Sequence, residues 1–496
     1  MTKEKDDQKL GWTERIGFGL GDLASNLYFQ MFNMFLLYYY TDVFGLQASV
    51  VANIFLFSRI WDAVNDPVMG IVADRTRTRW GNFRPYLLWL AVPYGAAGYL
   101  MFYSPDLSMT GKIVYAAVTY TVVGMVYTGI NIPYSGLMAV ISKSSAERAR
   151  ISSIRFIFAF LGGFIIVQFL PPLTSSLGGG DPVLGFRYTM GLFSVLATIM
   201  FLITFVTTKE RVKPELQKQT KAQLMGDLKL LIRERAWLIL AIAGILNLTA
   251  VAIKNGSNIF YFKYYVESPN FETEVSSFGG GGWIAMILGV MATGLLIKFF
   301  ERRKLIIWLT IFGGIGMMAP YWIDPDLRIT MPGLQTGAYT VFGLTMPSIQ
   351  FVPENARWIY IMNLIGSFSA GPPVAIIWSM YTDVAAYIDW KHKRRITGLV
   401  VAAAVFSQKF GMAFGGWFAA TLLGWFGFVA NAVQTDDSKW AILLLFSLIP
   451  GILVVFQGAI IFLYPLTDDQ VKNIEMDLAQ RNLEKDEEDA KNGLTS

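Results

Sequence analysis

Polar and charged side chains occur together inside one long apolar stretch near the N-terminus. Residues 46–73 are apolar enough to cross a membrane as a helix, yet they contain Arg59, Asp62, Asn65 and Asp66. A charge at the bilayer centre costs about 2.5–3.5 kcal/mol on insertion scales, so such groups need a partner, water or a function. Spacings of three and four residues place Arg59, Asp62 and Asp66 on one helical face, with Asn65 beside it. Two carboxylates and an amide oxygen suit a sodium ion or a shared proton. The alternative interpretation is an Arg59–Asp62 ion pair that joins helices.

Further ionisable residues inside apolar stretches are Asp22, Arg155, Lys254, Asp383 and Lys409. Both lysines lie near the middle of their stretches. We therefore favour a polar partner inside the bundle over the alternative, in which each side chain extends to the membrane surface. Asp383 is expected in a gate or a structural ion pair. The glycine-rich run before Asp22 permits close helix packing and, without a preceding strand, does not indicate a nucleotide site.

Long apolar helices must position these side chains. The chain has 496 residues, of which 54% are hydrophobic and 16% charged, whereas an average soluble domain has about 25% charged residues. Its apolar runs are too long for barrel strands and do not alternate with period 2. We predict an all-α integral membrane protein with twelve spans, at 16–41, 46–73, 85–104, 112–141, 152–177, 186–207, 237–266, 277–300, 305–323, 358–385, 398–427 and 441–465.

The loops between these spans alternate in charge. Loops rich in Lys and Arg are 75–84, 143–150, 209–235, 298–304 and 391–395. By the positive-inside rule these loops are cytoplasmic, and so are both termini. The longest basic loop divides the chain into an N-terminal six-helix half (1–207), a basic linker (208–236), a C-terminal six-helix half (237–466) and an acidic cytoplasmic tail (467–496). Two such halves are typical of secondary transporters, which bind their substrate at the interface near mid-membrane.

Three segments outside the spans carry local signals. In the linker, Leu216, Leu224, Leu228 and Leu231 could form the apolar face of a helix on the membrane surface. The outer segment 324–357 is expected to be a passive insertion, although it could cap the outer mouth. In the tail, Thr467-Asp-Asp-Gln470 fits a capping box that begins a short helix.

Composition excludes several classes of function. The chain has no cysteine, and its one histidine is His392, so thiolate and histidine metal sites and disulfides are excluded. The net charge of +5 resides in short loops, which argues against nucleic-acid binding. A membrane-embedded enzyme would have to use Ser–Lys or carboxylate chemistry, and no repeated filter sequence indicates a channel. We predict a transporter without a cofactor, not an enzyme, and expect no cleavable signal peptide.

Several motifs resemble those of one transporter family. They are Tyr38-Tyr-Tyr-Thr-Asp-Val-Phe-Gly45, Arg59-Ile-Trp-Asp-Ala-Val-Asn-Asp-Pro-Val-Met-Gly70, Thr76-Arg-Thr-Arg-Trp-Gly-Asn-Phe-Arg-Pro85, Asn131-Ile-Pro-Tyr134, Arg155-Phe156 and Lys409. The chain thus resembles the glycoside–pentoside–hexuronide:cation symporters, the melibiose permease group of the major facilitator superfamily. The resemblance implies a bacterial inner-membrane protein, a monomer in lipid, that carries a sugar with Na⁺ or H⁺. Its cation ligands fall on Asp62, Asn65, Asp66 and Thr128.

The family's sugar-binding positions, with Lys254 added here, fall on Asp22, Tyr127, Asn131, Ser135, Arg155, Lys254 and Lys409. Asn131 and Ser135 replace an aspartate and a tryptophan of the melibiose permease pattern, so melibiose itself is not expected. Asp22 with Arg155, Lys254 and Lys409 leaves two positive charges in excess. This excess favours an anionic sugar such as a uronate, glucuronide or sulfonated sugar. If Lys254 pairs elsewhere, a neutral glycoside is equally consistent.

The resemblance also implies a mechanism. The two halves rock about a central site, so that it faces one side of the membrane at a time. A cation on Asp62 and Asp66 stabilises the form that accepts sugar, and each ligand then raises the affinity for the other. Asp74 and Arg75, with Asp383, are expected at the cytoplasmic gate. The main rival keeps the fold but carries a lysolipid.

Overall fold

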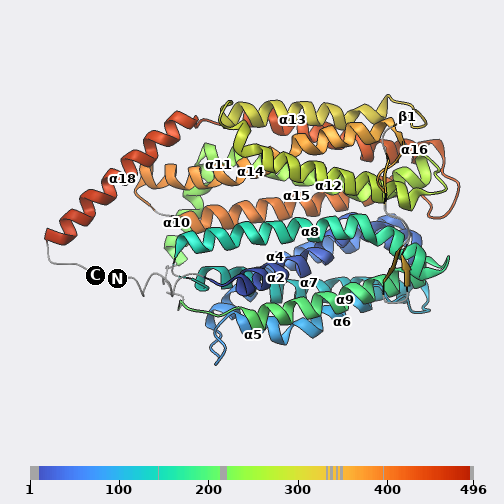
Figure 1. Ribbon diagram of the computed structural model, residues 1–496, viewed down its shortest axis with the longest axis horizontal. Helices are drawn as coiled ribbons and strands as arrows, with labels where there is room; N and C mark the ends of the chain where they lie inside the picture. Colours follow the sequence, from blue (N-terminus) through green and yellow to red (C-terminus); the bar gives the residue numbers. More distant parts are fainter. Residues whose placement is uncertain are drawn as a thin grey trace.

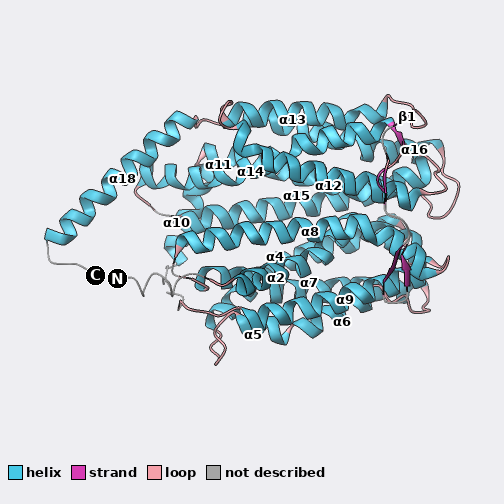
Figure 2. Cartoon of the chain, in the orientation of Figure 1, coloured by secondary structure: helices cyan, strands magenta, loops and turns pink. Residues whose placement is uncertain are grey.

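The computed structural model is a bundle of long, roughly parallel helices with a few short strands at one end (Figure 2). It describes residues 10–142, 144–212, 221–330, 333–335, 339–341, 344–346, 350–394 and 396–491. Among these residues, nine helices are long and apolar enough to cross a membrane. The predicted all-α architecture is confirmed.

The N-terminal half contains the first six predicted spans. Its helices are α2 (Trp12–Met34), α3 (Leu36–Tyr38), η1 (Tyr39–Val43), α4 (Ala48–Arg75), α5 (Arg84–Trp89), α6 (Ala91–Met101), α7 (Met109–Val140), α8 (Ser145–Gly178) and α9 (Pro182–Thr207). The first three predicted spans are missing from the set of nine. The break at Leu90 divides the third into two short helices. Helix α2 of the first is long enough but too polar, with Glu14, Asp22 and several Gly and Asn residues, and charged residues interrupt the apolar face of α4.

The C-terminal half follows the linker helix α10 (Lys221–Arg233). Its helices are α11 (Arg235–Phe260), η2 (Tyr261–Tyr265), α12 (Phe271–Leu296), α13 (Arg302–Met318), η3 (Ala319–Tyr321), α14 (Trp358–His392), α15 (Thr397–Trp425), α16 (Asp436–Leu443), η4 (Leu444–Leu448), α17 (Ile449–Ile461) and the tail helix α18 (Asp468–Lys491). Between η3 and α14, β1 (Arg328–Thr330), β2 (Leu334–Gln335) and β3 (Tyr339–Val341) pair antiparallel with β6 (Asn355–Arg357), β5 (Gln350–Val352) and β4 (Leu344–Met346).

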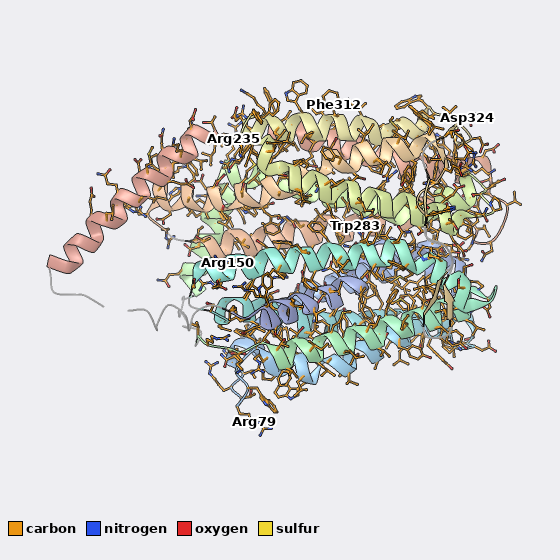
Figure 3. All side chains as sticks on the ribbon, in the orientation of Figure 1. Arg79, Arg150, Arg235, Trp283, Phe312 and Asp324 are labelled. Carbon is orange, nitrogen blue, oxygen red and sulfur yellow. The ribbon has the colours of Figure 1, made fainter. Side chains whose placement is uncertain are left out.

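The two ends of the bundle differ. Helices α10 and α18 lie at one end, and β1 and α16 lie at the other (Figure 1). Figure 3 places Arg150 and Arg235 at the first end and Asp324 at the second. Following the charge-based prediction of orientation, we call the first the inner end and the second the outer end.

Small residues let the helices that carry the site approach closely. In α15, a Cβ on Gly415 would lie 2.6 Å from the Thr249 carbonyl oxygen of α11. A Cβ on Gly371 of α14 would lie 2.5 Å from the Met286 carbonyl oxygen of α12. Close backbone approach through glycine is the usual way to gain packing energy between membrane helices, where no hydrophobic force joins them.

Two predicted local features can be compared with the structure. Leu231 of the linker is fully buried in the core of the C-terminal half, so it packs against protein instead of the membrane surface. Leu216 and the side chain of Leu224 lie outside the described residues. The capping box is confirmed, because the Thr467 amide donates to Gln470 Oε1 (3.0 Å) and the Gln470 amide donates to Thr467 Oγ1 (3.3 Å).

Candidate functional site

Asp66 joins three helices at the interface between the two halves. The hydroxyl of Thr128 on α7 donates to Asp66 Oδ1 at 2.8 Å. The ammonium of Lys409 on α15 forms an ion pair with Asp66 Oδ2. Helices α4 and α15 also pack against each other. A carboxylate on α4 thus contacts a cation supplied by the other half.

The other predicted cation ligands lie along the same helix. Asp62 faces α7, where a Cβ on Gly124 would lie 3.1 Å from its Oδ1. In the described part of the chain, the buried Nδ2 of Asn65 has no hydrogen-bond partner. Since the two ends of an amide are assigned from their partners, a flip would direct the Asn65 oxygen there instead. The side chain of Arg59 lies outside the described side chains, so the alternative Arg59–Asp62 pair stays untested.

Asp22 and Arg155 form the second charged contact at mid-bundle. Arg155 Nε on α8 lies 3.2 Å from Asp22 Oδ1 on α2. The Arg155 guanidinium carbon lies 5.3 Å from the ring centroid of Tyr134, whose hydroxyl donates to the Phe18 carbonyl oxygen at 2.6 Å. These contacts connect α2, α7 and α8.

The predicted sugar-binding residues of α7 recur every fourth residue and therefore share one helical face. Asn131 donates its Nδ2 to the Tyr127 carbonyl oxygen (3.0 Å), and its Oδ1 accepts from the Ser25 hydroxyl of α2 (2.6 Å). Ser135, one turn further on, is exposed. Asn131 thus faces α2, and Tyr127 and Ser135 lie one turn to either side of it on α7.

Lys254 is not brought together with these residues. Its ammonium donates to the Phe446 carbonyl oxygen at 2.7 Å and lies 3.2 Å from the Phe446 ring centroid. The cavity beside it measures about 20 Å³, which is room for a water molecule and not for a sugar. Its described contacts all lie within the C-terminal half.

Of the predicted gate residues, Arg75 and Asp383 have described side chains, and no described contact joins them. Asp383 Oδ2 lies 2.9 Å from Arg302 Nη1, and Arg302 Nε lies 2.6 Å from Asp468 of the tail helix. Asp383 therefore has a structural partner within its own half. Arg75 ends α4 and is exposed. The side chain of Asp74 lies outside the described side chains.

A cluster at the outer end was not predicted as functional from the sequence. We call Asp42, Lys263, Tyr264 and Asn431 the outer network. Lys263 Nζ lies 2.7 Å from Asp42 Oδ1 and 2.9 Å from Asn431 Oδ1, and the Tyr264 hydroxyl also bonds Asp42. Asn431 Nδ2 donates to the Asp42 carbonyl oxygen at 2.7 Å. Because Asp42 belongs to the N-terminal half and the others to the C-terminal half, the network joins the halves.

A signal for this network existed in the sequence. The first span ends at Asp42, and the seventh, its counterpart in the second half, ends near Lys263. Opposite charges at equivalent ends of two pseudo-symmetric halves indicate a contact across the interface. Charges near span ends reach water and need no partner, so their position gave no reason to predict that these two residues pair.

Ion pairs at the inner end do not join the two halves, as far as the described residues show. Arg211, near the start of the linker, pairs with Glu14 of the N-terminal half at 2.7 Å. Glu234, near the end of the linker, pairs with Lys391 of the C-terminal half at 2.9 Å and accepts from His392 at 2.7 Å. Burial tends to raise the pKa of the Glu234 carboxyl, but the hydrogen bonds from Lys391 and His392 outweigh burial and lower it.

Two bundles of apolar helices that enclose charged groups at their interface define a multi-pass membrane transporter. The chain belongs to the MFS/sugar transport protein family, whose model matches residues 17–468. It is 32% identical to the inner membrane symporter YicJ of Escherichia coli over 94% of this chain and 95% of that protein. It is 29% identical to the isoprimeverose transporter of Lactiplantibacillus pentosus, over 95% of this chain and 92% of that protein.

Solved structures agree on the fold. A D-xylose-proton symporter superposes with a TM-score of 0.62 at 14% identity, over 92% of this chain and 98% of that one. The predicted major facilitator fold and family are therefore confirmed. The protein is a transporter and not an enzyme.

Proposed function

We propose that this protein carries a sugar or glycoside across the membrane together with a cation, by alternating access. The observation that carries the proposal is the position of Asp66, which contacts Thr128 of its own half and Lys409 of the other. Because Asp66 contacts both halves, a cation that binds to it can change the contacts of both. The name of YicJ, an inner membrane symporter, supports symport and a bacterial inner-membrane location.

Competition for Asp66 provides the coupling. A cation bound by Asp62, Asn65, Asp66 and Thr128 would replace the Lys409 ammonium on the Asp66 carboxylate. The freed ammonium, which is about half exposed, can then bond a sugar hydroxyl in the space between the halves. Because the linkage is reciprocal, sugar on Lys409 raises the affinity of Asp66 for the cation by the same factor.

The charges favour a neutral substrate over an anionic one. Lys254 has its contacts elsewhere, and Arg155 pairs with Asp22. Among the described side chains of the site, Lys409 and one monovalent cation together balance Asp62 and Asp66. These side chains then leave no positive charge in excess to attract an acid. The isoprimeverose transporter is similar to this chain, and we therefore place neutral glycosides first and anionic sugars second.

Oxygen ligands favour sodium as the coupling ion. Asp62, Asp66, Thr128 and a flipped Asn65 offer two carboxylates, a hydroxyl and an amide oxygen, which match a hard cation. Proton coupling would need only the carboxylates, so Asn65 and Thr128 distinguish the two ions.

The outer network supports an inward-facing state. Lys263 joins the halves at the outer end, whereas no ion pair between described residues does so at the inner end. We propose that the outer network is the outer gate, which must break when the site faces outward.

Uptake into proteoliposomes under an imposed sodium or proton gradient tests the proposal. A panel of xylosides, glucosides and glucuronides gives the substrate class. We expect a sodium gradient to drive accumulation of a neutral glycoside in the parent protein, and Asp62→Asn and Asp66→Asn to abolish it while exchange persists. Asp389→Asn, which alters a carboxylate of the inner end, is the control and should accumulate normally. Accumulation by the Asp66→Asn protein would refute the cation site.

A further inference from the structure

A cavity of about 250 Å³ lies between the halves at the outer end. Phe35 and Tyr38 of the first span and Phe186 of α9 form its buried wall on the N-terminal side. Lys263 and Phe271 form the wall on the C-terminal side. It is separate from the contacts of Asp66 and Asp22, none of which lines it.

The lining has the mixed chemistry that sugars bind. Aromatic rings offer flat apolar faces to the C–H face of a sugar ring, and a few polar groups fix its hydroxyls. Here Thr174 and Ser175 of α8 provide hydroxyls, and Glu272 of α12 provides a carboxylate. The volume is below the roughly 300–1,000 Å³ of pockets for drug-sized ligands, so it suits a single sugar ring or a small glycoside.

The charges around the cavity exclude an anion. Its one ammonium, on Lys263, already pairs with Asp42, which is buried. Glu272 and Asp181 also line the cavity and are both acidic. A carboxylate or sulfonate ligand would meet net negative charge, whereas sugar hydroxyls can donate both to Glu272 and to the oxygen of Ser175, whose own hydroxyl bonds Glu272.

The cavity is open to the outer surface. Ser175 and Asp181 at its rim are exposed, while Phe35 and Phe186 at its floor are buried. Its two walls belong to different halves, so the cavity exists in this form only while the outer network is closed. A ligand in it stabilises that state by its differential affinity.

We propose that this cavity is a second binding site, for a neutral sugar ring or small glycoside arriving from outside, and that its occupation holds the outer gate closed. The inference rests on the proposed alternating access for its effect on transport, but the binding site itself does not. External sugar at high concentration should therefore slow its own uptake.

Because the chain lacks cysteine, a single introduced thiol reports occupation of the cavity. Ser175→Cys places the thiol on the rim, and Ser176→Cys, on the neighbouring exposed residue outside the cavity, is the matched control. Both full-length variants are reacted with a membrane-impermeant maleimide added outside. The probes are methyl and 4-nitrophenyl xylosides and glucosides, with glucuronate as the charged comparison.

At a probe concentration about nine times Kd, labelling of the Ser175→Cys protein should slow about tenfold, since one site in ten is then free. Labelling of the Ser176→Cys protein should not change, and glucuronate should protect neither. Protection must persist when Asp22→Asn is added, because the central site then cannot cause it. Failure of all neutral probes to protect, or loss of protection with Asp22→Asn, would overturn the proposal.

The same variants separate this inference from the proposed function. Protection without gradient-driven uptake of any sugar would keep the second site and refute symport. Uptake without protection would support symport and refute the second site. Ser175→Trp, which fills the rim, should remove the inhibition by external sugar, whereas Ser176→Trp should keep it.

Discussion

Removing the charge of Lys263 tests whether the outer network controls which side of the membrane the site faces. Lys263→Met leaves the Asp42 carboxylate buried, with Tyr264 and the Thr41 hydroxyl (2.7 Å) as its remaining donors. Breaking a buried ion pair commonly costs about 3–5 kcal/mol. Because those two donors stay and Lys263 is partly exposed, we expect a cost at or just below the low end of that range, about 2–3 kcal/mol.

This cost applies only to the closed state, since Asp42 regains water when the outer end opens. At about 1.4 kcal/mol per factor of ten, the ratio of outward-open to closed protein should rise about 30- to 140-fold. The assay is the rate at which an external, membrane-impermeant maleimide labels a Ser135→Cys reporter. Labelling should accelerate by that factor as long as the closed state predominates in the parent.

Two further variants make the test specific. Lys112→Met removes another lysine of the outer end, whose ammonium bonds the Phe44 carbonyl oxygen (3.2 Å) within the N-terminal half. It should leave the rate unchanged. Adding Asp42→Asn to Lys263→Met should return part of the lost stability of the closed state, because no charge is then left buried. Equal rates for Lys263→Met and Lys112→Met would refute the gate assignment.

Three other predictions concern coupling, packing and pH. Lys409→Met removes the ammonium that competes with sodium for Asp66. Because Lys409 is about half exposed, its ion pair with Asp66 contributes about 1 kcal/mol. Sodium should therefore bind about fivefold more tightly in a calorimetric titration, and an unchanged affinity would contradict the competition. Gly415→Ala should cost about 1–3 kcal/mol through the close approach of α15 to α11, lowering the thermal unfolding midpoint, whereas Gly398→Ala, with open space around it on the same helix, should not. Glu234 has a lowered pKa in the folded protein, so its contribution to stability is complete above its ordinary value of 4.5 and is lost as pH falls below that value. The unfolding midpoint of Glu234→Gln should accordingly lie below that of the parent at pH 7 and approach it as the pH falls from 4.5 through the lowered pKa, and a constant difference would contradict this.

Much of the fold follows from local sequence. Apolar runs of membrane length, basic loops on alternate connections and the linker between two sets of six spans predict the bundle, because in lipid every backbone group must be bonded within its own helix. Charges inside such runs stand out for the same reason. That is why Asp62 and Asp66 could be predicted as cation ligands from residue type and spacing, with Thr128 added by the family resemblance. The Asp66–Thr128 contact is formed, and the cation site itself stays a prediction.

The contacts between residues far apart in the chain could not be predicted from local sequence. The sequence marks Lys254 and Lys409 as similar buried lysines, yet one bonds a backbone carbonyl oxygen inside its own half and the other reaches Asp66 of the opposite half. Asp383 likewise pairs with Arg302, which in turn pairs with Asp468 of the tail helix. Helical periodicity gives the face of a residue but not which helix packs on that face.

The sequence by itself determined that the protein spans a membrane and has two halves, and it predicts that helix α4 carries the acids of a cation site. Only the tertiary structure decided that Asp42 meets Lys263 at the outer end, that Asp22 pairs with Arg155 and Asp66 with Lys409, and that a cavity remains beside the outer network. The physical reason is distance along the chain. Apolar length and charge are properties of neighbouring residues, whereas these contacts join residues hundreds of positions apart and depend on how two rigid halves are docked.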